Sequence, residues 1–131
     1  MILVCVTDQK TSSRLIIAGR KLADIKQTPL KVICVRPRQA ASWLASDEVE
    51  FLFNISKQQD AEMIVLFNDD PMRATIDYID KHKVKFIVTG IPPEPGYSAF
   101  ISGLEDSFPH IPLVTVDHQG NLQKLSPVHT A

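Results

Sequence analysis

Short apolar runs alternate along the chain with segments in which apolar residues recur every three or four positions. The run 2–6 is apolar throughout, which is typical of a strand buried on both faces of a sheet. The segment after Thr11 instead places Leu15, Ala18, Leu22 and Ile25 on one face of a helix. The same two patterns predict strands at 2–6, 30–35, 63–67, 86–89 and 113–116, with a helix between each pair.

Polar residues and prolines mark the expected helix ends. Asp70 should cap the third helix, with Pro71 at its first position, because proline lacks the N–H that a first helical residue leaves unused. The other predicted boundaries are Ser12 or Ser13 for the first helix, Thr28-Pro29 for its end, Ser46 for the second helix and a start near Ser98 for the fourth.

The predicted helices should bury different apolar sets. The second is expected to bury Leu52, Ile55 and the neighbouring phenylalanines. The expected stripes of the third and fourth helices are Met72, Ile76 and Ile79, and Ile101, Leu104 and Phe108.

Strand and helix alternate four times, which predicts an α/β fold. We expect a single, doubly wound, five-stranded parallel sheet with helices on both faces and right-handed crossovers. A turn at 118–121 predicts that 122–125 returns as a short antiparallel edge strand. The chain is expected to be one domain, 1–131, in which 126–131 fray.

Composition narrows the class of partners. The 131 residues carry 14 basic and 15 acidic side chains, a net charge of −1, with no local run of Lys or Arg. Proteins that bind nucleic acid or anionic membranes through many phosphates usually carry a basic excess, so neither partner is expected. No apolar stretch approaches the ~20 residues of a membrane helix, and 1–6 is too short for a signal peptide, so a cytoplasmic protein is expected.

Cysteine and histidine give no sign of a metal centre. Cys5 and Cys34 both lie inside apolar strand-like runs, where free cysteine usually serves as a small buried hydrophobe. The four histidines show no ligand spacing with one another or with cysteine. We therefore expect no metal.

In an open parallel sheet, ligands bind at the carboxyl ends of the strands, which directs attention to the loops 7–12, 36–38, 68–70 and 90–98. Neither a Walker loop nor a GxGxxG follows the first strand. The requirements of a phospho-receiver site, paired acids after the first strand and a lysine at the end of the fifth, are not met either. Asp8 stands alone, and the fifth strand ends in Asp117, not lysine. No nucleophile and base are placed together, so no catalytic residue is proposed and the chain is not expected to be an enzyme.

The segment Ile2 to Asp8, with a helix beginning about six residues later, resembles the opening of universal stress proteins. It is most similar to the stress-protein domain of potassium-sensing histidine kinases and that domain's free-standing relatives. The run 32–37, Val-Ile-Cys-Val-Arg-Pro, looks like the family's second strand, and 50–57 followed by 61–63 is similar to the free-standing group. The resemblance covers nearly the whole chain and implies a universal-stress-type regulatory module.

Nucleotide-binding members of that family carry a glycine signature after the fourth strand. Gly90 and Gly103 match its first and third glycines at the right spacing. Pro93 stands at the second glycine and Leu104 at the hydroxyl residue that follows the third, while Glu94 adds a negative charge. Proline has no N–H and leucine has no hydroxyl to donate to phosphate, so the loop is degenerate.

The resemblance implies an adenine nucleotide, ATP or AMP, with cyclic di-AMP as a weaker alternative and no cofactor required. The resemblance implies Thr7 or Asp8 for the sugar or base, Val35 beside the base, and the loop glycines Gly90 and Gly103. From the residues themselves, the candidates to hold an anion are the backbone amides at the helix start near Ser98 and the side chain of Lys10 or Arg14. The alternative is an interaction module of the same fold that has lost nucleotide binding. The family often dimerises through its fifth strand, so a homodimer is expected, with an unknown protein partner.

Overall fold

The predicted strands and helices are all present in the structure, a computed structural model that describes residues 1–7, 9–40, 47–90 and 99–124. The strands are β1 (Ile2–Val6), β2 (Leu30–Arg36), β3 (Glu62–Phe67), β4 (Phe86–Gly90), β5 (Leu113–Val116) and β6 (Leu122–Lys124). The helices are α1 (Ser13–Lys26), α2 (Asp47–Gln58), α3 (Pro71–Asp80) and α4 (Ala99–Ser107), and short 3₁₀ turns, η1 and η2, occupy Lys10–Ser12 and Arg38–Ala40.

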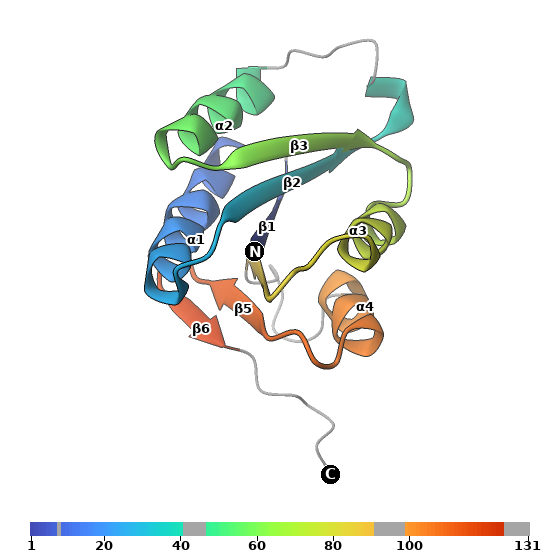
Figure 1. Ribbon diagram of the computed structural model, residues 1–131. Helices are drawn as coiled ribbons and strands as arrows, with labels where there is room; N and C mark the ends of the chain where they lie inside the picture. The colour runs from blue at the N-terminus through green and yellow to red at the C-terminus, as the bar shows by residue number, and fades with distance from the viewer. Residues whose placement is uncertain (8, 41–46, 91–98, 125–131) are drawn as a thin grey trace.

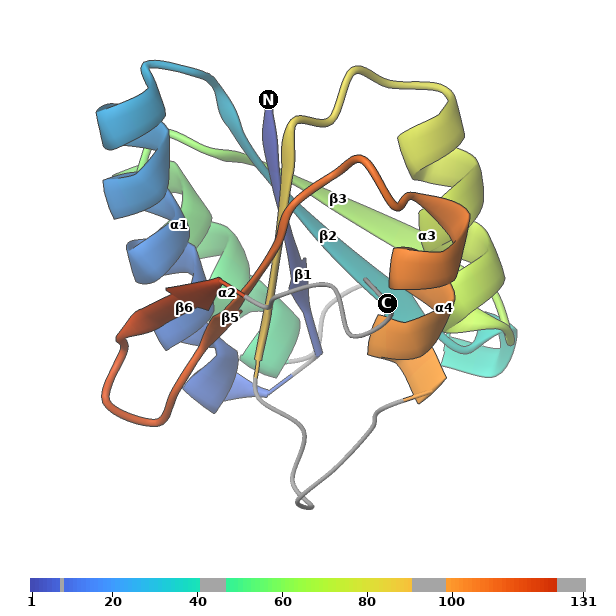
Figure 2. The ribbon, with the colours of Figure 1, turned by 90° about the horizontal axis from the view of Figure 1, so that it is seen from below.

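The strands form one sheet of six in the order β3-β2-β1-β4-β5-β6 (Figure 1). All neighbouring pairs are parallel except β5 and β6, so the doubly wound parallel sheet with a short antiparallel edge is confirmed. Helices α1 and α2 cover one face and α3 and α4 the other, as the view along the sheet shows (Figure 2). The strand order reverses at β1, which lies between β2 and β4.

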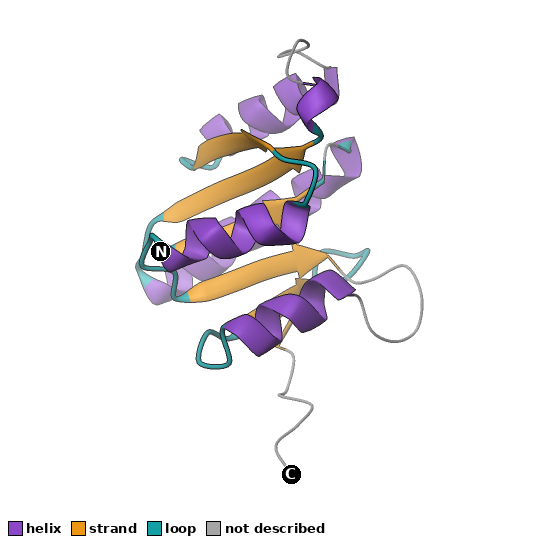
Figure 3. Cartoon of the chain, turned by 90° about the vertical axis from the view of Figure 1, so that its right-hand side faces the viewer, coloured by secondary structure: helices purple, strands orange, loops and turns teal. Residues whose placement is uncertain are grey.

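Two apolar clusters lie on the two sides of the sheet, and β1 contributes to both. Successive side chains of a strand point to opposite faces, so Ile2, Val4 and Val6 join the cluster beneath α1 and α2. Leu3 and Cys5 join the cluster beneath α3 and α4, the face seen in Figure 3. The all-apolar sequence of β1 is thus explained by burial on both faces.

Helix α1 packs close to the sheet because Gly19 faces β1. A Cβ atom at Gly19 would lie 2.5 Å from Val4 Cγ2 and 3.1 Å from Leu30 Cδ1. The buried face is centred on this contact, and Ile25, predicted to be buried, is 71% exposed. The helix ends at Lys26, and Gln27 takes the left-handed conformation with φ 51° before the predicted stop at Pro29.

The second helix differs from its predicted pattern. Leu52 is buried and Ile55 partly buried, as expected, but the other buried residues of the helix are Val49 and Ser56. Phe51 and Phe53 are 36% and 43% exposed. The prediction that these phenylalanines are buried was wrong, because they lie one position to either side of Leu52 and therefore point away from the axis that Leu52 defines.

One of the predicted helix caps is present in the structure as a side-chain hydrogen bond. The Asp70 side chain accepts a hydrogen bond of 3.1 Å from the Arg73 N–H, and Pro71 begins α3, so that predicted start is confirmed. Helix α1 begins at Ser13, after η1, and the Ser12 side chain bonds elsewhere. The predicted caps Ser46 and Ser98 and the tail 126–131 lie outside the described residues.

Candidate functional site

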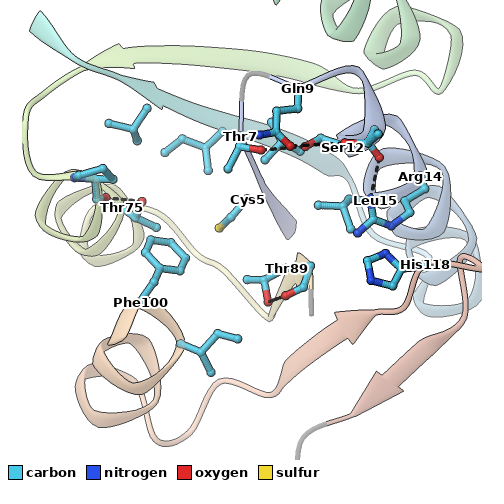
Figure 4. A pocket seen from close by; sticks show the side chains of 17 residues that line it. Cys5, Thr7, Gln9, Ser12, Arg14, Leu15, Thr75, Thr89, Phe100 and His118 are labelled. Atoms are coloured by element: carbon cyan, nitrogen blue, oxygen red, sulfur yellow. Dashed lines mark hydrogen bonds between the residues drawn. The ribbon is translucent and has the colours of Figure 1, made fainter. Parts of the chain in front are cut away.

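An open cleft of about 940 Å³ lies at the carboxyl ends of β1, β2 and β4, where the strand order reverses (Figure 4). This is the position at which open parallel sheets bind ligands, and the volume lies near the upper end of the ~300–1,000 Å³ typical of ligand sites. Its walls come from the segment after β1, the ends of β2 and β4, the first turns of α3 and α4, and the turn after β5.

Hydroxyl groups line the wall beside β1. Thr7 follows the strand, and its Oγ1 lies 3.1 Å from the Oγ of Ser12, which is only 5% exposed. This bond ties the end of β1 to the start of α1 and turns η1 inward, so that Gln9 and Thr11 also reach the cleft. The described residues that line this wall before Arg14 are polar and uncharged.

Two further threonines lie deeper, and each uses its proton within the protein. Thr75 Oγ1 donates to the Pro71 carbonyl at 2.8 Å, and Thr89 Oγ1 donates to the Gly90 carbonyl at 3.3 Å. Both are nearly fully buried. A hydroxyl that has donated its one proton retains only acceptor lone pairs, so these two groups can accept hydrogen bonds from a ligand.

Arg14 is the fixed cation of the cleft. Its Nη1 donates to the Thr11 carbonyl at 2.8 Å and its Nε donates to the Asp117 carbonyl at 3.2 Å. These bonds join α1 to the turn between β5 and β6. His118, in the same turn, lines the same side of the cleft (Figure 4).

The turn that holds Arg14 is organised by the Asp117 carboxylate. Its Oδ1 accepts from the N–H groups of Gln119 at 2.9 Å and Asn121 at 2.8 Å, and its Oδ2 accepts from the Asn121 side chain. The Asn121 N–H is the main reason that the pKa of Asp117 is lowered from its ordinary value. The carboxylate is therefore committed to the turn, and Asp117 faces Arg14 with its main-chain carbonyl.

Apart from the Thr75 hydroxyl, the described residues of the floor and the far wall are apolar. Cys5, Val35 and Phe100 line the cleft together with Ile33 and Ile101, and all five belong to the cluster beneath α3 and α4. Cys5 lies at the centre of the floor (Figure 4), and burial raises the pKa of its thiol to about 12. The thiol is therefore protonated at neutral pH and acts as an apolar surface, not as a nucleophile.

The structure brings together four of the residues singled out from sequence. Thr7, Arg14, Val35 and Gly90 all line the cleft. Lys10 does not, because its Nζ lies 5.7 Å from the ring centre of Phe51 on α2. Asp8 and Ser98 lie outside the described residues.

The end of the glycine signature lies away from the cleft. Gly103 is on α4 against α3, where an added Cβ would overlap the Sδ of Met72. The neighbouring Leu104 is 1% exposed and belongs to the core. Gly103 therefore has the close-packing role that a helix glycine can supply, and the position of the family's hydroxyl is filled by a core side chain.

Sequence reasoning missed the cleft residues Thr75, Thr89, Phe100 and His118. Thr89 ends a predicted strand beside Gly90, so its position was accessible from the strand boundary. Thr75 and Phe100 lie on helix faces predicted only as core, and no spacing within the chain distinguishes a side chain that faces a cleft from one that faces the sheet.

Comparison with known proteins supports the fold and leaves the ligand open. No family model matches the sequence, and no curated protein matches it. Among solved structures, a universal stress protein in complex with cAMP superposes with a TM-score of 0.69 at 14% identity, covering 89% of this chain and 95% of that one. The chain has the universal-stress-protein fold.

Other structures with this fold agree. The universal stress protein from Archaeoglobus fulgidus gives a TM-score of 0.59 at 16% identity, over 79% of this chain and 84% of that one. A universal stress protein from the same organism, in complex with dAMP, gives a TM-score of 0.57 at 18% identity, over 87% of this chain and 94% of that one. A deacetylase of teicoplanin biosynthesis also matches, with a TM-score of 0.58 at 11% identity over 88% and 69%, so the sheet architecture alone does not define the chemistry.

No helix among the described residues is both long and apolar enough to cross a membrane. No three side chains of the His, Cys, Asp and Glu types in that part of the chain are grouped as a metal would need.

Proposed function

We propose that this protein is a non-catalytic, cytoplasmic, universal-stress-type regulatory module that binds an adenine nucleotide, AMP or ATP, in the cleft between β1 and β4. Within that family we place it with the free-standing relatives of the stress-protein domain of potassium-sensor histidine kinases, on the resemblance of 50–57 and 61–63. Thr7 and Val35 contribute to the ligand wall, and Asp8 is assigned to the sugar or base by resemblance. The cAMP and dAMP complexes of proteins with the same fold support this class of ligand.

The proposal is carried by the presence of glycine at position 90, where the described structure does not require it. The φ of Gly90 is not positive, since Gly120 is the one described glycine with positive φ. Among described atoms, a Cβ at Gly90 would make ordinary contacts of 3.7 Å with Arg14 Nη2 and Leu15 Cδ1. Neither backbone geometry nor packing in the described part of the chain requires glycine here, whereas a ligand that approaches the backbone closely does.

Substitution of Gly90 tests the proposal. Because the Cβ fits, Gly90→Ala should keep the melting temperature of the free protein, whereas the larger side chain of Gly90→Val should block the space that a ligand needs beside the backbone. We expect calorimetric titration with AMP and ATP to show binding to the wild type, with an affinity that falls from glycine to alanine to valine at position 90. The matched control is Gly103→Ala, which changes a glycine against Met72, outside the cleft, and should leave the dissociation constant unchanged.

The protein's stability gives an independent measure of the same binding. A nucleotide at about one hundred times its dissociation constant adds ~2.7 kcal/mol to the free energy of unfolding. Flat titrations with AMP, ATP and cyclic di-AMP, together with unchanged melting temperatures at millimolar nucleotide, would exclude an adenine-nucleotide function.

The second candidate is a homodimeric interaction module that has lost nucleotide binding. Leu104 favours it, because this side chain is buried where the family's nucleotide-binding members place a hydroxyl. The two candidates differ in their response to nucleotide, and light scattering over a range of concentrations tests the dimer.

A further inference from the structure

The cleft is divided into two chemically different ends. Arg14 and His118 lie on one side, whereas Phe100 and Thr75 lie on the opposite side, with Cys5 between them (Figure 4). The side bearing Phe100 is continuous with the apolar cluster beneath α3 and α4. A ligand that fills the cleft must therefore carry an anionic or strongly polar group at one end and an apolar, planar group at the other.

The cationic end is held in place before any ligand arrives. Arg14 is fixed by its bonds to the carbonyls of Thr11 and Asp117, which come from opposite ends of the chain. Its Nη2 lies 3.7 Å from the position of a Cβ on Gly90, so the guanidinium stands directly beside a cleft residue that has no side chain. A group resting on the Gly90 backbone comes within reach of this charge.

The charge of Arg14 is not neutralised by the described carboxylates. None of them lies within ion-pair distance of Arg14, and no described residue that lines the cleft is acidic. The nearest candidate, Asp117, uses both carboxylate oxygens within its own turn. A cation fixed by carbonyl groups, with no described carboxylate paired to it, is a strong partner for a phosphate.

We propose that Arg14 and His118 form the phosphate subsite of this protein, on the α1 side of the cleft, with the base of the nucleotide against Phe100 and Val35. The inference rests on the proposed nucleotide function and adds the orientation of the ligand. It moves phosphate recognition from the glycine signature after β4, whose hydroxyl position is the buried Leu104 of α4, to side chains of α1 and of the β5–β6 turn.

A comparison of AMP with adenosine by calorimetry tests the orientation. A charge-assisted contact contributes ~1.5–3 kcal/mol, so the wild type should bind AMP at least about tenfold more tightly than adenosine. Arg14→Gln should remove this preference and leave the adenosine affinity unchanged. His118→Gln should reduce the preference in the same direction, and Arg14→Lys should give an intermediate value because it keeps the charge and loses the planar fork.

Two further variants separate the ends of the cleft. Phe100→Leu should weaken AMP and adenosine by the same factor, because the base is common to both. Arg38→Gln, an exposed arginine of η2 that does not line the cleft, is the matched control and should keep the AMP preference. Melting temperatures of the free variants identify any that fail to fold, in which case His118→Gln decides.

The affinities for AMP and adenosine decide separately on the phosphate subsite and on adenine binding. Equal affinity of the wild type for AMP and adenosine, or an equal loss of both in Arg14→Gln, overturns the phosphate subsite while the adenine-binding function stands. Failure of the wild type to bind either compound overturns both. An AMP preference that depends on Arg14 and His118 and not on Arg38 supports the orientation.

Discussion

The contact between Gly19 and β1 allows a quantitative test of how closely α1 must pack. Replacing Gly19 by alanine puts a methyl group 2.5 Å from Val4 Cγ2, whereas carbon atoms pack at ~3.5–4.0 Å, so the overlap is about 1 Å. Val4 is fully buried and has a stiff, β-branched side chain, so it cannot turn aside freely.

Two opposing effects set the magnitude. Overpacking of a core costs ~1–3 kcal/mol, and alanine gains ~1 kcal/mol over glycine in a helix interior. The net destabilisation should therefore be about 1 kcal/mol, or about 4 °C in melting temperature for a chain of this length. Urea unfolding followed by circular dichroism measures the difference.

A double-mutant cycle identifies the cause. Val4→Ala alone removes buried methyl groups and should cost about 2 kcal/mol. Combined with Gly19→Ala, it makes room for the new methyl group, so the double variant should be more stable than the sum of the single changes by about 1 kcal/mol. Additivity within ~0.5 kcal/mol would refute the steric account, because it would mean that the two positions do not interact.

Three further changes test other parts of the structure. Asp70→Ala removes the acceptor for the Arg73 N–H at the start of α3 and should lower the free energy of unfolding in urea by about 1 kcal/mol. The ion pair between the Arg73 side chain and Asp77 does not involve Asp70 and should remain. Gly103→Ala should be near neutral in the same assay, because the neighbouring Met72 is unbranched and can move. For Cys5, whose pKa burial raises to about 12, iodoacetamide labelling followed by mass spectrometry should be much slower in the folded than in the unfolded protein. Since the unfolded thiol ionises first, the free energy of unfolding should fall as the pH rises from 9.0 towards 12; labelling that is equally fast in both states would contradict this.

The strands could be predicted from sequence because burial on both faces leaves a continuous apolar run. The prediction for β5, 113–116, coincides with the structure, and the antiparallel return at β6 followed from the turn that Asp117 and Gly120 organise. Helix faces were harder. On α2 a cluster of apolar residues around Leu52 left the facing direction ambiguous, and tertiary packing selected Val49 and Ser56 in place of the phenylalanines.

The location of the site could be predicted from sequence, but most of the side chains that line it and their charge could not. Parallel topology predicts a cleft at the carboxyl ends of the strands, and Thr7, Val35 and Gly90 do line it. The charge of the cleft could not be assigned, because Lys10 and Arg14 both follow β1 and only the three-dimensional path of η1 separates them. That path sends Lys10 towards Phe51 and Arg14 towards Asp117.

The position of β1 between β2 and β4 also bears on how the protein is made. Residues 1–67 supply three adjacent strands, β3-β2-β1, and both helices of one face, so this part can begin to assemble while the ribosome is still adding the remainder. Until β4 arrives, the inner edge of β1 has no partner, and an unpaired apolar edge is a template for pairing with other chains. The strand that borders the cleft is thus also an unpaired apolar edge of the nascent chain, and truncations before residue 86 should be insoluble for this reason.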